Sequence, residues 1–235
     1  MPMSLKASCS INLGFPYHQH KTPAQSLSCL SSFLNEQKEN GTEIDAELGN
    51  DHGARLLEDK MAKLLGTEAA LWFPTGVLAQ GIAARIHGQQ MNNDQLLLHP
   101  SSHLLLHEEH GYGHAHGCSA KVIGKWREPL TSDDISGDPG CAFVELPQRH
   151  SGGKLPNWSE LQKIKNRCKT LGIPLHMDGA RLWSCRPFYD NRSYADIVAG
   201  FDSVYVSFYK DIGAMGGAVL AGSQEFIDEA RKWRT

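Results

Sequence analysis

The fold is decided by the stretch Ile173-Pro-Leu-His-Met-Asp-Gly-Ala-Arg181, in which an apolar run ends in a carboxylate. We predict a buried strand over residues 173–178 and a second one over 203–208, which Lys210 follows after two residues. Lys210 lies 32 residues after Asp178, which leaves room for one crossover between parallel strands. Since the carboxyl ends of parallel strands share one edge of a sheet, we expect Asp178 and Lys210 to project from the same edge.

Helices and strands alternate on both sides of this unit. Further strands are predicted at residues 69–73, 95–99, 121–124, 141–146 and 218–221, helices at 54–65, 77–87, 102–109 and 158–171, and a loop at 132–140. Such alternation is typical of βαβ units, so the sequence predicts an α/β fold with a mainly parallel sheet. Residues 1–48 are polar and weakly patterned, and we expect an irregular N-terminal arm there with a helix near 24–39.

Composition excludes several classes of protein. The 235 residues are 40% hydrophobic and 21% charged, which favours a folded globular chain over a disordered one. The formal charge of −3 offers no basic surplus for nucleic acid or for an anionic membrane, and no run approaches the about 18 apolar residues of a membrane span. The six cysteines form no CxxC pair, and the N-terminus lacks the apolar core of a signal peptide. We therefore expect a cytoplasmic protein without a disulfide scaffold.

Asp178 and Lys210 suggest a specific chemistry. A carboxylate at a strand end is costly to desolvate and should face a cation, which is either Arg181 in a structural ion pair or the protonated nitrogen of a heterocyclic cofactor. A lysine desolvated in the same pocket can form a Schiff base with an aldehyde. Pyridoxal 5'-phosphate (PLP) requires such a lysine together with an acid that keeps its pyridine nitrogen protonated. The two residues together favour the cofactor over the isolated ion pair.

Thr75-Gly76-Val77 lies at the predicted start of a helix. Free backbone N–H groups and the helix dipole favour a phosphate there, while an ordinary N-cap formed by Thr75 explains the same residues equally well. Only its combination with Asp178 and Lys210 favours a phosphate site.

Histidines raise the question of a metal. Six of the 12 histidines lie between His99 and His116, but Pro100 interrupts any helix from His99 to His103, and no HExxH motif occurs. The alternative is that His103 stacks on an aromatic cofactor and the others are surface or packing residues, which is our preferred interpretation. No GxGxxG, GxxxxGK[ST] or GxSxG motif is present, which disfavours Rossmann oxidoreductases, P-loop NTPases and α/β-hydrolases.

Several motifs resemble one known family. They are Gly66-Thr-Glu-Ala-Ala-Leu-Trp-Phe-Pro-Thr-Gly76, Ser102-His-Leu-Leu-Leu-His-Glu108, Gly152-Gly-Lys-Leu-Pro156, His176-Met-Asp-Gly-Ala-Arg-Leu-Trp183 and Ser207-Phe-Tyr-Lys210. In this order, from about Gly49 to the last residue, they resemble the threonine aldolase and β-eliminating lyase family of PLP enzymes. Glu145-Leu-Pro-Gln-Arg149 is typical of its lyase-related branch.

The resemblance implies the aspartate-aminotransferase type of fold. Its large domain is a mainly parallel, seven-stranded sheet flanked by helices, and we expect it over residues 49–235. The family's small C-terminal domain would then be absent from this chain. The resemblance also implies a homodimer or homotetramer.

The resemblance also assigns roles to individual residues. Lys210 carries the Schiff base, Asp178 partners the pyridine nitrogen, Arg181 binds the cofactor's phenolic oxygen or the substrate carboxylate, and His103 stacks on the ring. The phosphate is held by Thr75, Gly76 and Val77, with Ser207 a weaker candidate, and Glu108 supports the site.

Three positions depart from the family. Gln148 replaces the histidine of the family's Glu-Asn-Thr-His, which contacts the substrate hydroxyl, and glutamine cannot act as a base at neutral pH. His150 is a candidate substitute. Leu48 replaces a tyrosine, and Thr75-Gly76-Val77 has one hydroxyl fewer than the family's Ser-Gly-Thr.

These observations predict a PLP-dependent lyase of small amino acids, with aldol cleavage of a β-hydroxy amino acid as the first choice. The alternatives are a β-eliminating lyase, a catalytically impaired PLP-binding homologue or fragment, and a metalloprotein built on the histidine cluster.

Overall fold

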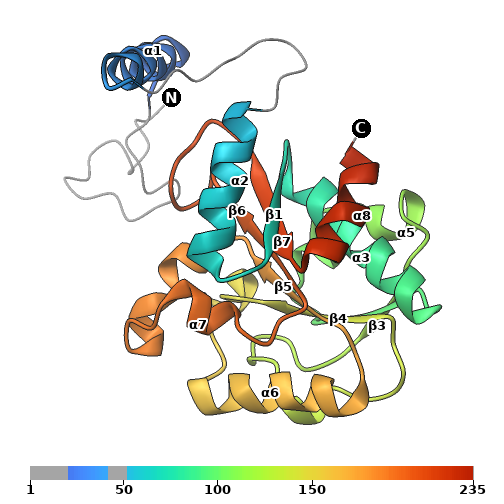
Figure 1. Ribbon diagram of the computed structural model, residues 1–235. Helices are drawn as coiled ribbons and strands as arrows, with labels where there is room; N and C mark the ends of the chain where they lie inside the picture. The colour runs from blue at the N-terminus through green and yellow to red at the C-terminus, as the bar shows by residue number, and fades with distance from the viewer. Residues whose placement is uncertain (1–20, 42–51, 235) are drawn as a thin grey trace, which may run out of the picture.

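A seven-stranded sheet forms the centre of the computed structural model, which describes residues 21–41 and 52–234 (Figure 1). The strands lie in the order β1-β7-β6-β5-β4-β2-β3. Their bounds are β1 Ala69–Phe73, β2 Gln95–Leu98, β3 Ser119–Val122, β4 Cys141–Glu145, β5 Leu175–Gly179, β6 Ser203–Ser207 and β7 Ala218–Gly222. Only β7 runs antiparallel to its neighbours, so the prediction of an α/β fold with a mainly parallel, seven-stranded sheet is confirmed.

Helices cover both faces of the sheet (Figure 1). Their bounds are α1 Pro23–Glu39, α2 His52–Leu65, α3 Gly76–Met91, α4 His103–Leu106, α5 Gly111–His114, α6 Trp158–Leu171, α7 Tyr194–Val198 and α8 Gln224–Arg234. α3 and α8 pack on one face through a cluster that includes Ile82, Ile86 and Phe226. α2, α6 and α7 pack on the other through a larger apolar cluster. Burial of both faces explains why the central strands are apolar without strict alternation.

β6 shows how the two faces differ. Val204 and Val206 belong to the larger cluster under α2, α6 and α7, whereas Tyr205 points to the face covered by α3. Since side chains alternate along a strand, Ser203 and Ser207 share the α3 face with Tyr205. Polar groups therefore lie on this face at both ends of a fully buried strand.

Most predicted elements are present, and the differences have local causes. The helix predicted at 102–109 is confined to His103–Leu106, because Glu109 and His110 have left-handed backbone φ angles of 46° and 56°. β3 begins two residues before the predicted start at 121 and ends at Val122, ahead of Gly124 at φ 78°. The sequence analysis missed α5, α7 and α8. α7 begins with a capping box between Ser193 and Asp196, a signal that could have located it.

The helix expected near 24–39 is present as α1, which lies apart from the sheet in Figure 1. The predicted boundary between residues 48 and 49, and Leu48 itself, lie outside the described residues. The five described cysteines are unpaired. Within 21–41 and 52–234, no helix is both long and apolar enough to span a bilayer.

Candidate active site

The carboxyl ends of five parallel strands bring the predicted residues to one edge of the sheet. β1 leads into the turn before α3, β2 leads to α4, and β4, β5 and β6 end in polar residues. The residues carried there are Thr75, Gly76, Val77, His103, Glu108, Gln148, His150, Asp178, Arg181, Ser207 and Lys210. β5 and β6 are adjacent and parallel, as the spacing of Asp178 and Lys210 predicts.

Two carboxylates lie side by side at this edge. Asp178 and Glu145 are register partners on β5 and β4, and only 3% and 8% of their surfaces are exposed. Asp178 Oδ1 accepts a hydrogen bond from the Ala180 N–H at 3.1 Å, and Glu145 Oε1 accepts one from the Arg149 N–H at 3.2 Å. Burial raises the pKa of both carboxyls, and the charge of Asp178 raises that of Glu145 further.

Lys210 is the main positive charge acting on Asp178. The lysine is 9% exposed, and burial lowers the pKa of its amine, a change that Asp178 opposes and Arg181 reinforces. Its Nζ lies 6.0 Å from the ring centre of Tyr205 and 5.8 Å from that of Tyr209. A buried amine whose pKa is lowered carries a larger share of its neutral, nucleophilic form. The site therefore contains a nucleophile beside an acid.

The start of α3 provides donors for an anion. Thr75 Oγ1 accepts a hydrogen bond from the Leu78 N–H at 3.2 Å, so Thr75 is the N-cap of this helix. The N–H groups of Gly76 and Val77 have no acceptor within the helix. A Cβ at Gly76 would lie 2.0 Å from the Tyr205 hydroxyl, so only glycine allows this close approach. Both interpretations of the segment survive, because a cap and an anion site use different groups.

His103 is held in place by Glu108. His103 Nδ1 lies 2.8 Å from Glu108 Oε1, and the exposed fractions of the two side chains are 26% and 3%. This contact fixes the position of Nδ1 and leaves a partly exposed ring at the edge of the site. The charges of His103 and Glu108 both act on Asp178, which places the three side chains in one region.

Three buried oxygens at this edge are unsatisfied. Glu145 Oε2, Gln148 Oε1 and Ser207 Oγ have no well-aligned hydrogen-bond partner among the described residues, although the Tyr205 hydroxyl lies near Ser207. Buried polar atoms are normally paired, so a cluster of unpaired ones at a strand edge indicates a place for a ligand.

A cavity of about 1010 Å³ adjoins this edge. Arg149 and Arg181 line it together with Trp183, Phe188 and Tyr194. The lining also includes the carboxylate of Asp211, so the two guanidinium groups leave a net positive charge beside an apolar wall, which suits a small carboxylate-bearing molecule.

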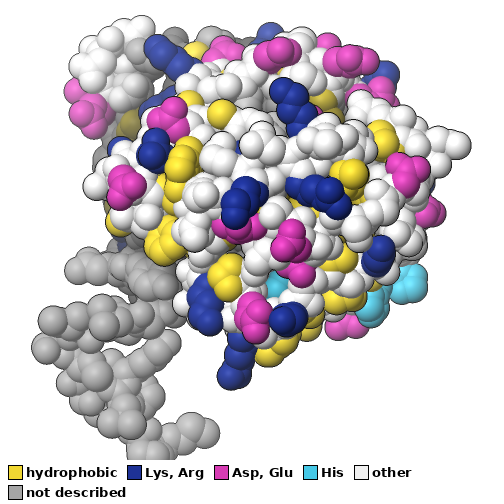
Figure 2. Space-filling view, turned by 90° about the horizontal axis from the view of Figure 1, so that it is seen from below, with side chains coloured by type: hydrophobic (Ala, Val, Ile, Leu, Met, Phe, Trp, Pro, Cys, Tyr) yellow, Lys and Arg dark blue, Asp and Glu magenta, His cyan; other side chains and the backbone are white. Residues whose placement is uncertain are grey.

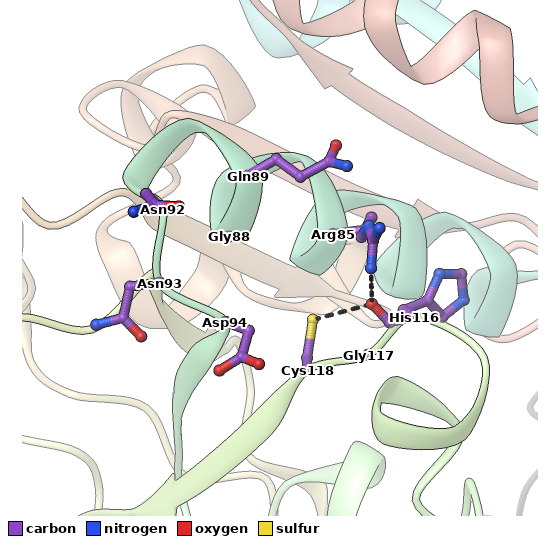
Figure 3. A pocket seen from close by; sticks show the side chains of 9 residues that line it. All are labelled: Arg85, Gly88, Gln89, Asn92, Asn93, Asp94, His116, Gly117 and Cys118. Carbon is purple, nitrogen blue, oxygen red and sulfur yellow. Dashed lines mark hydrogen bonds between the residues drawn. The ribbon is translucent and has the colours of Figure 1, made fainter.

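A second pocket, of about 650 Å³, lies at the opposite edge (Figure 3). It is lined by the end of α3, by Asp94 just before β2 and by residues 116–118. Arg85 donates a hydrogen bond to the His116 carbonyl at 2.9 Å, and the Cys118 thiol points to the same oxygen. No predicted site residue lines this pocket.

The histidine cluster does not show the arrangement of a metal centre in the part of the chain that the structure describes. Among the described residues, no group of three or more His, Cys, Asp or Glu side chains is arranged to hold a metal ion. His99 instead contacts Ser101 Oγ at 2.7 Å and the Lys125 carbonyl at 3.1 Å.

The face seen in Figure 2 has Lys and Arg side chains intermixed with Asp and Glu, so charges of both signs share it.

Sequence reasoning missed Tyr205, Glu145 and His107 as parts of this region. Glu145 ends an otherwise apolar strand, which is the signal that identified Asp178. Tyr205 had no such signal, because it lies inside an apolar strand and resembles a core residue.

Known proteins share this architecture. The sequence profile of the family described as beta-eliminating lyase matches residues 36–235. Low-specificity L-threonine aldolase 1 of Arabidopsis thaliana is 32% identical over 213 residues, covering 82% of this chain and 57% of the relative. The low specificity L-threonine aldolase of Saccharomyces cerevisiae is 30% identical over 203 residues, covering 81% and 51%. This chain thus spans little more than half the length of these curated relatives.

A solved structure from Listeria monocytogenes EGD-E, provisionally assigned as an L-allo-threonine aldolase, superposes with a TM-score of 0.77. The two sequences are 42% identical, and the match covers 86% of this chain and 57% of the other. A structure from Exiguobacterium sp. 255-15, provisionally assigned as an aromatic amino acid beta-eliminating lyase/threonine aldolase, gives 0.81 at 34% identity, covering 92% and 60%. The profile match and these relatives show that the chain belongs to the beta-eliminating lyase family, which includes the threonine aldolases.

Proposed function

We propose that this chain is a PLP-dependent lyase that cleaves the Cα–Cβ bond of a β-hydroxy amino acid, with Lys210 as the residue that holds the cofactor. The observation that carries the proposal is the juxtaposition of a buried acid and a buried amine. Asp178 and Lys210 end adjacent parallel strands, and each acts on the pKa of the other. The names of the curated relatives support threonine as the type of substrate.

The residues present fit PLP. Its phosphate matches the unpaired N–H groups of Gly76 and Val77 at the start of a 16-residue helix. Asp178 supplies a buried carboxylate for the pyridine nitrogen, and Ser207 Oγ is a buried oxygen that lacks a well-aligned partner among the described residues. When bound, PLP supplies an aldehyde that reacts with amines and a ring that takes up the electron pair of a bond broken at Cα.

Each residue then has a defined task. Lys210 provides a neutral amine because burial disfavours its charged form. Asp178 would supply the carboxylate that holds a proton on the pyridine nitrogen of the cofactor, and His103, held by Glu108, would pack against the cofactor ring. Arg181 and Arg149 line the adjoining cavity and bind the substrate carboxylate.

β-Elimination is the second candidate. It uses the same lysine and acid, and the Exiguobacterium relative's assignment includes it. The two reactions give different products, since aldol cleavage releases an aldehyde and elimination releases an α-keto acid. Product analysis with β-hydroxy amino acids therefore distinguishes them. A chain that binds the cofactor and turns over neither substrate is the third outcome.

The domain assignment and the assembly belong to the same proposal. Residues 49–235 would form a PLP-binding large domain that acts as a cytoplasmic homodimer or homotetramer. Light scattering of the purified chain, with and without PLP, measures the assembly directly.

The decisive experiment is a titration of the purified chain with PLP. We expect a new visible absorbance band that Lys210→Ala abolishes and that the control Lys169→Ala, which removes an exposed lysine, retains. Added β-hydroxy amino acids should then release an aldehyde. If the parent chain gives no band, or if Lys210→Ala keeps it, the proposal is wrong.

A further inference from the structure

Two histidines outside the predicted cofactor site form an imidazole pair at its rim. His107 follows α4, and His150 lies in the 3-10 turn Arg149–Ser151 after β4, 43 residues later. Their Nε2 atoms are 2.7 Å apart, and the rings stack with centroids 4.8 Å apart at an interplanar angle of 30°. The contact joins two loops and is not a consequence of local sequence.

We propose that this pair, His107–His150, accepts the proton of the substrate's β-hydroxyl group during Cα–Cβ cleavage. The inference rests on the proposed function, because only that reaction requires such a proton acceptor. It assigns to two residues of this chain a task that Gln148 cannot perform.

The hydrogen bond determines how many protons the pair can hold. At 2.7 Å one Nε2 must donate and the other must accept, so the two rings cannot both carry a proton on Nε2. The donating ring keeps a free lone pair on Nδ1. The pair can therefore take up one proton, and the resulting imidazolium donates a stronger, charge-assisted bond to its partner.

The groups around the His107–His150 pair favour its neutral form, which can accept a proton. Partial desolvation lowers the pKa of both imidazoles. For His150 the charge of His107 is the next largest cause, and for His107 it is that of His103. The other charged groups acting on the pair are Arg149 on both rings, Arg181 on His150, and Glu108, which opposes the shift on His107. His103, Arg149 and Arg181 thus favour the neutral form of the pair at neutral pH.

The His107–His150 pair lies close to His103 and to the cavity that we propose for the substrate. The His107 ring centre is 5.0 Å from that of His103, and Arg181, whose charge acts on both His150 and Lys210, lines the cavity at this edge. Both rings are partly or fully exposed, so they reach the solvent-facing side of that edge.

The neighbouring groups are less suited to the task. His103, whose Nδ1 contacts Glu108, packs against the cofactor ring in the proposed function, and Glu145 is buried with one oxygen bonded to the Arg149 N–H. Gln148 is 2% exposed and does not titrate in water. Among these groups the His107–His150 pair is the one whose titratable nitrogens have no other task in the proposed function.

Transfer of the hydroxyl proton accompanies cleavage of the Cα–Cβ bond. The O–H bond breaks and its proton goes to the free imidazole nitrogen, while the oxygen's electron pair forms the C=O bond of the aldehyde. The electrons of the Cα–Cβ bond stay with Cα. Cα then takes a proton to give glycine, and the imidazolium returns its proton to solvent or to Cα.

The pair can be tested without any reaction, by ¹⁵N NMR titration of the histidines. In His107→Gln we expect the His150 pKa to rise, because the glutamine oxygen can still accept a hydrogen bond from the His150 imidazolium while the neighbouring positive charge is removed. The matched control His114→Gln removes an exposed histidine of α5 and should leave His150 unchanged. An unchanged His150 titration in His107→Gln would mean that the pair does not exist in solution.

The catalytic arm uses two substrates with PLP-loaded protein. In His150→Gln we expect cleavage of a β-hydroxy amino acid to fall by about 10²-fold, the usual effect of losing general-base catalysis. Exchange of the glycine Cα proton with deuterium, which involves no hydroxyl, should stay within about twofold, and the absorbance band should persist. Equal losses in both reactions, or none in cleavage, overturn the role of the pair. Absence of the band in the parent chain overturns the proposed function instead.

Discussion

The two ends of strand β6 carry the same residue in opposite circumstances. Ser203 Oγ, at the amino end, lies 2.7 Å from His87 Nε2 and 2.7 Å from His176 Nδ1. Ser207 Oγ, at the carboxyl end of the same face, is equally buried and has no well-aligned partner among the described residues. A hydroxyl between two acceptors or donors contributes to stability, whereas an unpaired one costs stability. The two hydroxyls therefore differ in pairing, as we expect if the ligand binds at the carboxyl end. In the amino-end cluster the atoms without a well-aligned partner among the described residues are ring nitrogens, His87 Nδ1 and His176 Nε2.

The neighbouring strand β5 repeats the contrast with charge. His176 points to the α3 face at the amino end, and burial lowers its pKa far enough to keep it neutral. Asp178, two residues later on the same face, has Lys210 as its strongest electrostatic partner. The amino-end cluster is thus polar and uncharged, while the carboxyl-end cluster holds buried charges. Buried charges are retained where they act on a ligand, because apolar residues would stabilise the fold better.

The largest effect should come from Asp178→Asn. The amide keeps the shape of the side chain but cannot hold a proton on a pyridine nitrogen, so we expect aldehyde release to fall by at least about 10³-fold, or about 4 kcal/mol. The melting temperature should change little, because the side-chain oxygen of asparagine can still accept the Ala180 N–H and the buried Lys210 amine can release its proton once its anionic neighbour is gone. Asp133→Asn, which changes an exposed carboxylate, is the control for both measurements. A clear loss of stability together with normal turnover would reverse the distinction between the two ends.

The amino-end cluster should dominate the acid sensitivity of the fold. Burial lowers the pKa of His87 from 6.5 to about 4, so between these values the unfolded chain binds a proton that the folded chain does not. The free energy of unfolding should therefore fall as the pH drops from 6.5 to 4, by about 3 kcal/mol from His87, and His176 adds to the loss.

Urea denaturation at several pH values measures this dependence. His87→Gln should flatten the curve, whereas His114→Gln should leave it unchanged. Equal slopes in the parent chain and in His87→Gln would show that the buried imidazole is not neutral in the folded state.

The sequence predicts one of these clusters better than the other. Asp178 and Lys210 are visible because polar residues at the ends of apolar strands break a pattern, and parallel topology brings such ends together. The His87–Ser203–His176 cluster gives no such signal. Its members lie up to 116 residues apart, and a histidine within a helix or strand has no fixed expectation of burial. The contact between His107 and His150, which are 43 residues apart, gives no signal in the sequence for the same reason.

Element types are predicted well and their ends less well. β1, β4, β6 and α6 follow from apolar runs and helical periodicity, and they occur within one residue of the predicted bounds. α4 ends early because His110 and its neighbour take left-handed conformations, which no apolar pattern reveals. The antiparallel direction of β7 is a property of topology, and the Gly-rich segment before it indicates only a turn.

Ser203→Ala tests the amino end of β6, where the serine hydroxyl bonds to two histidines. The substitution removes the hydrogen-bond partner of two buried imidazoles at once, so we expect a loss of about 2 kcal/mol in the free energy of unfolding. PLP affinity should not change, because the residue lies at the opposite end of the strand from Lys210. Chemical denaturation and a PLP titration on the same preparation give both numbers. A weakened PLP affinity at unchanged stability would contradict the assignment of this end as structural.

Ser207→Ala is the matched substitution at the other end and should have the smallest effect on the fold. Its hydroxyl lacks a well-aligned partner among the described residues, so its removal should change the free energy of unfolding by less than about 0.5 kcal/mol. PLP binding should weaken about three- to tenfold, since one hydrogen bond to a charged group is lost, about 1 kcal/mol. Serine-to-alanine substitutions on the same face of β6 would then lower stability at the amino end and PLP affinity at the carboxyl end. That result would tie the unpaired oxygen to the ligand, because a packing role for Ser207 predicts a change in stability instead.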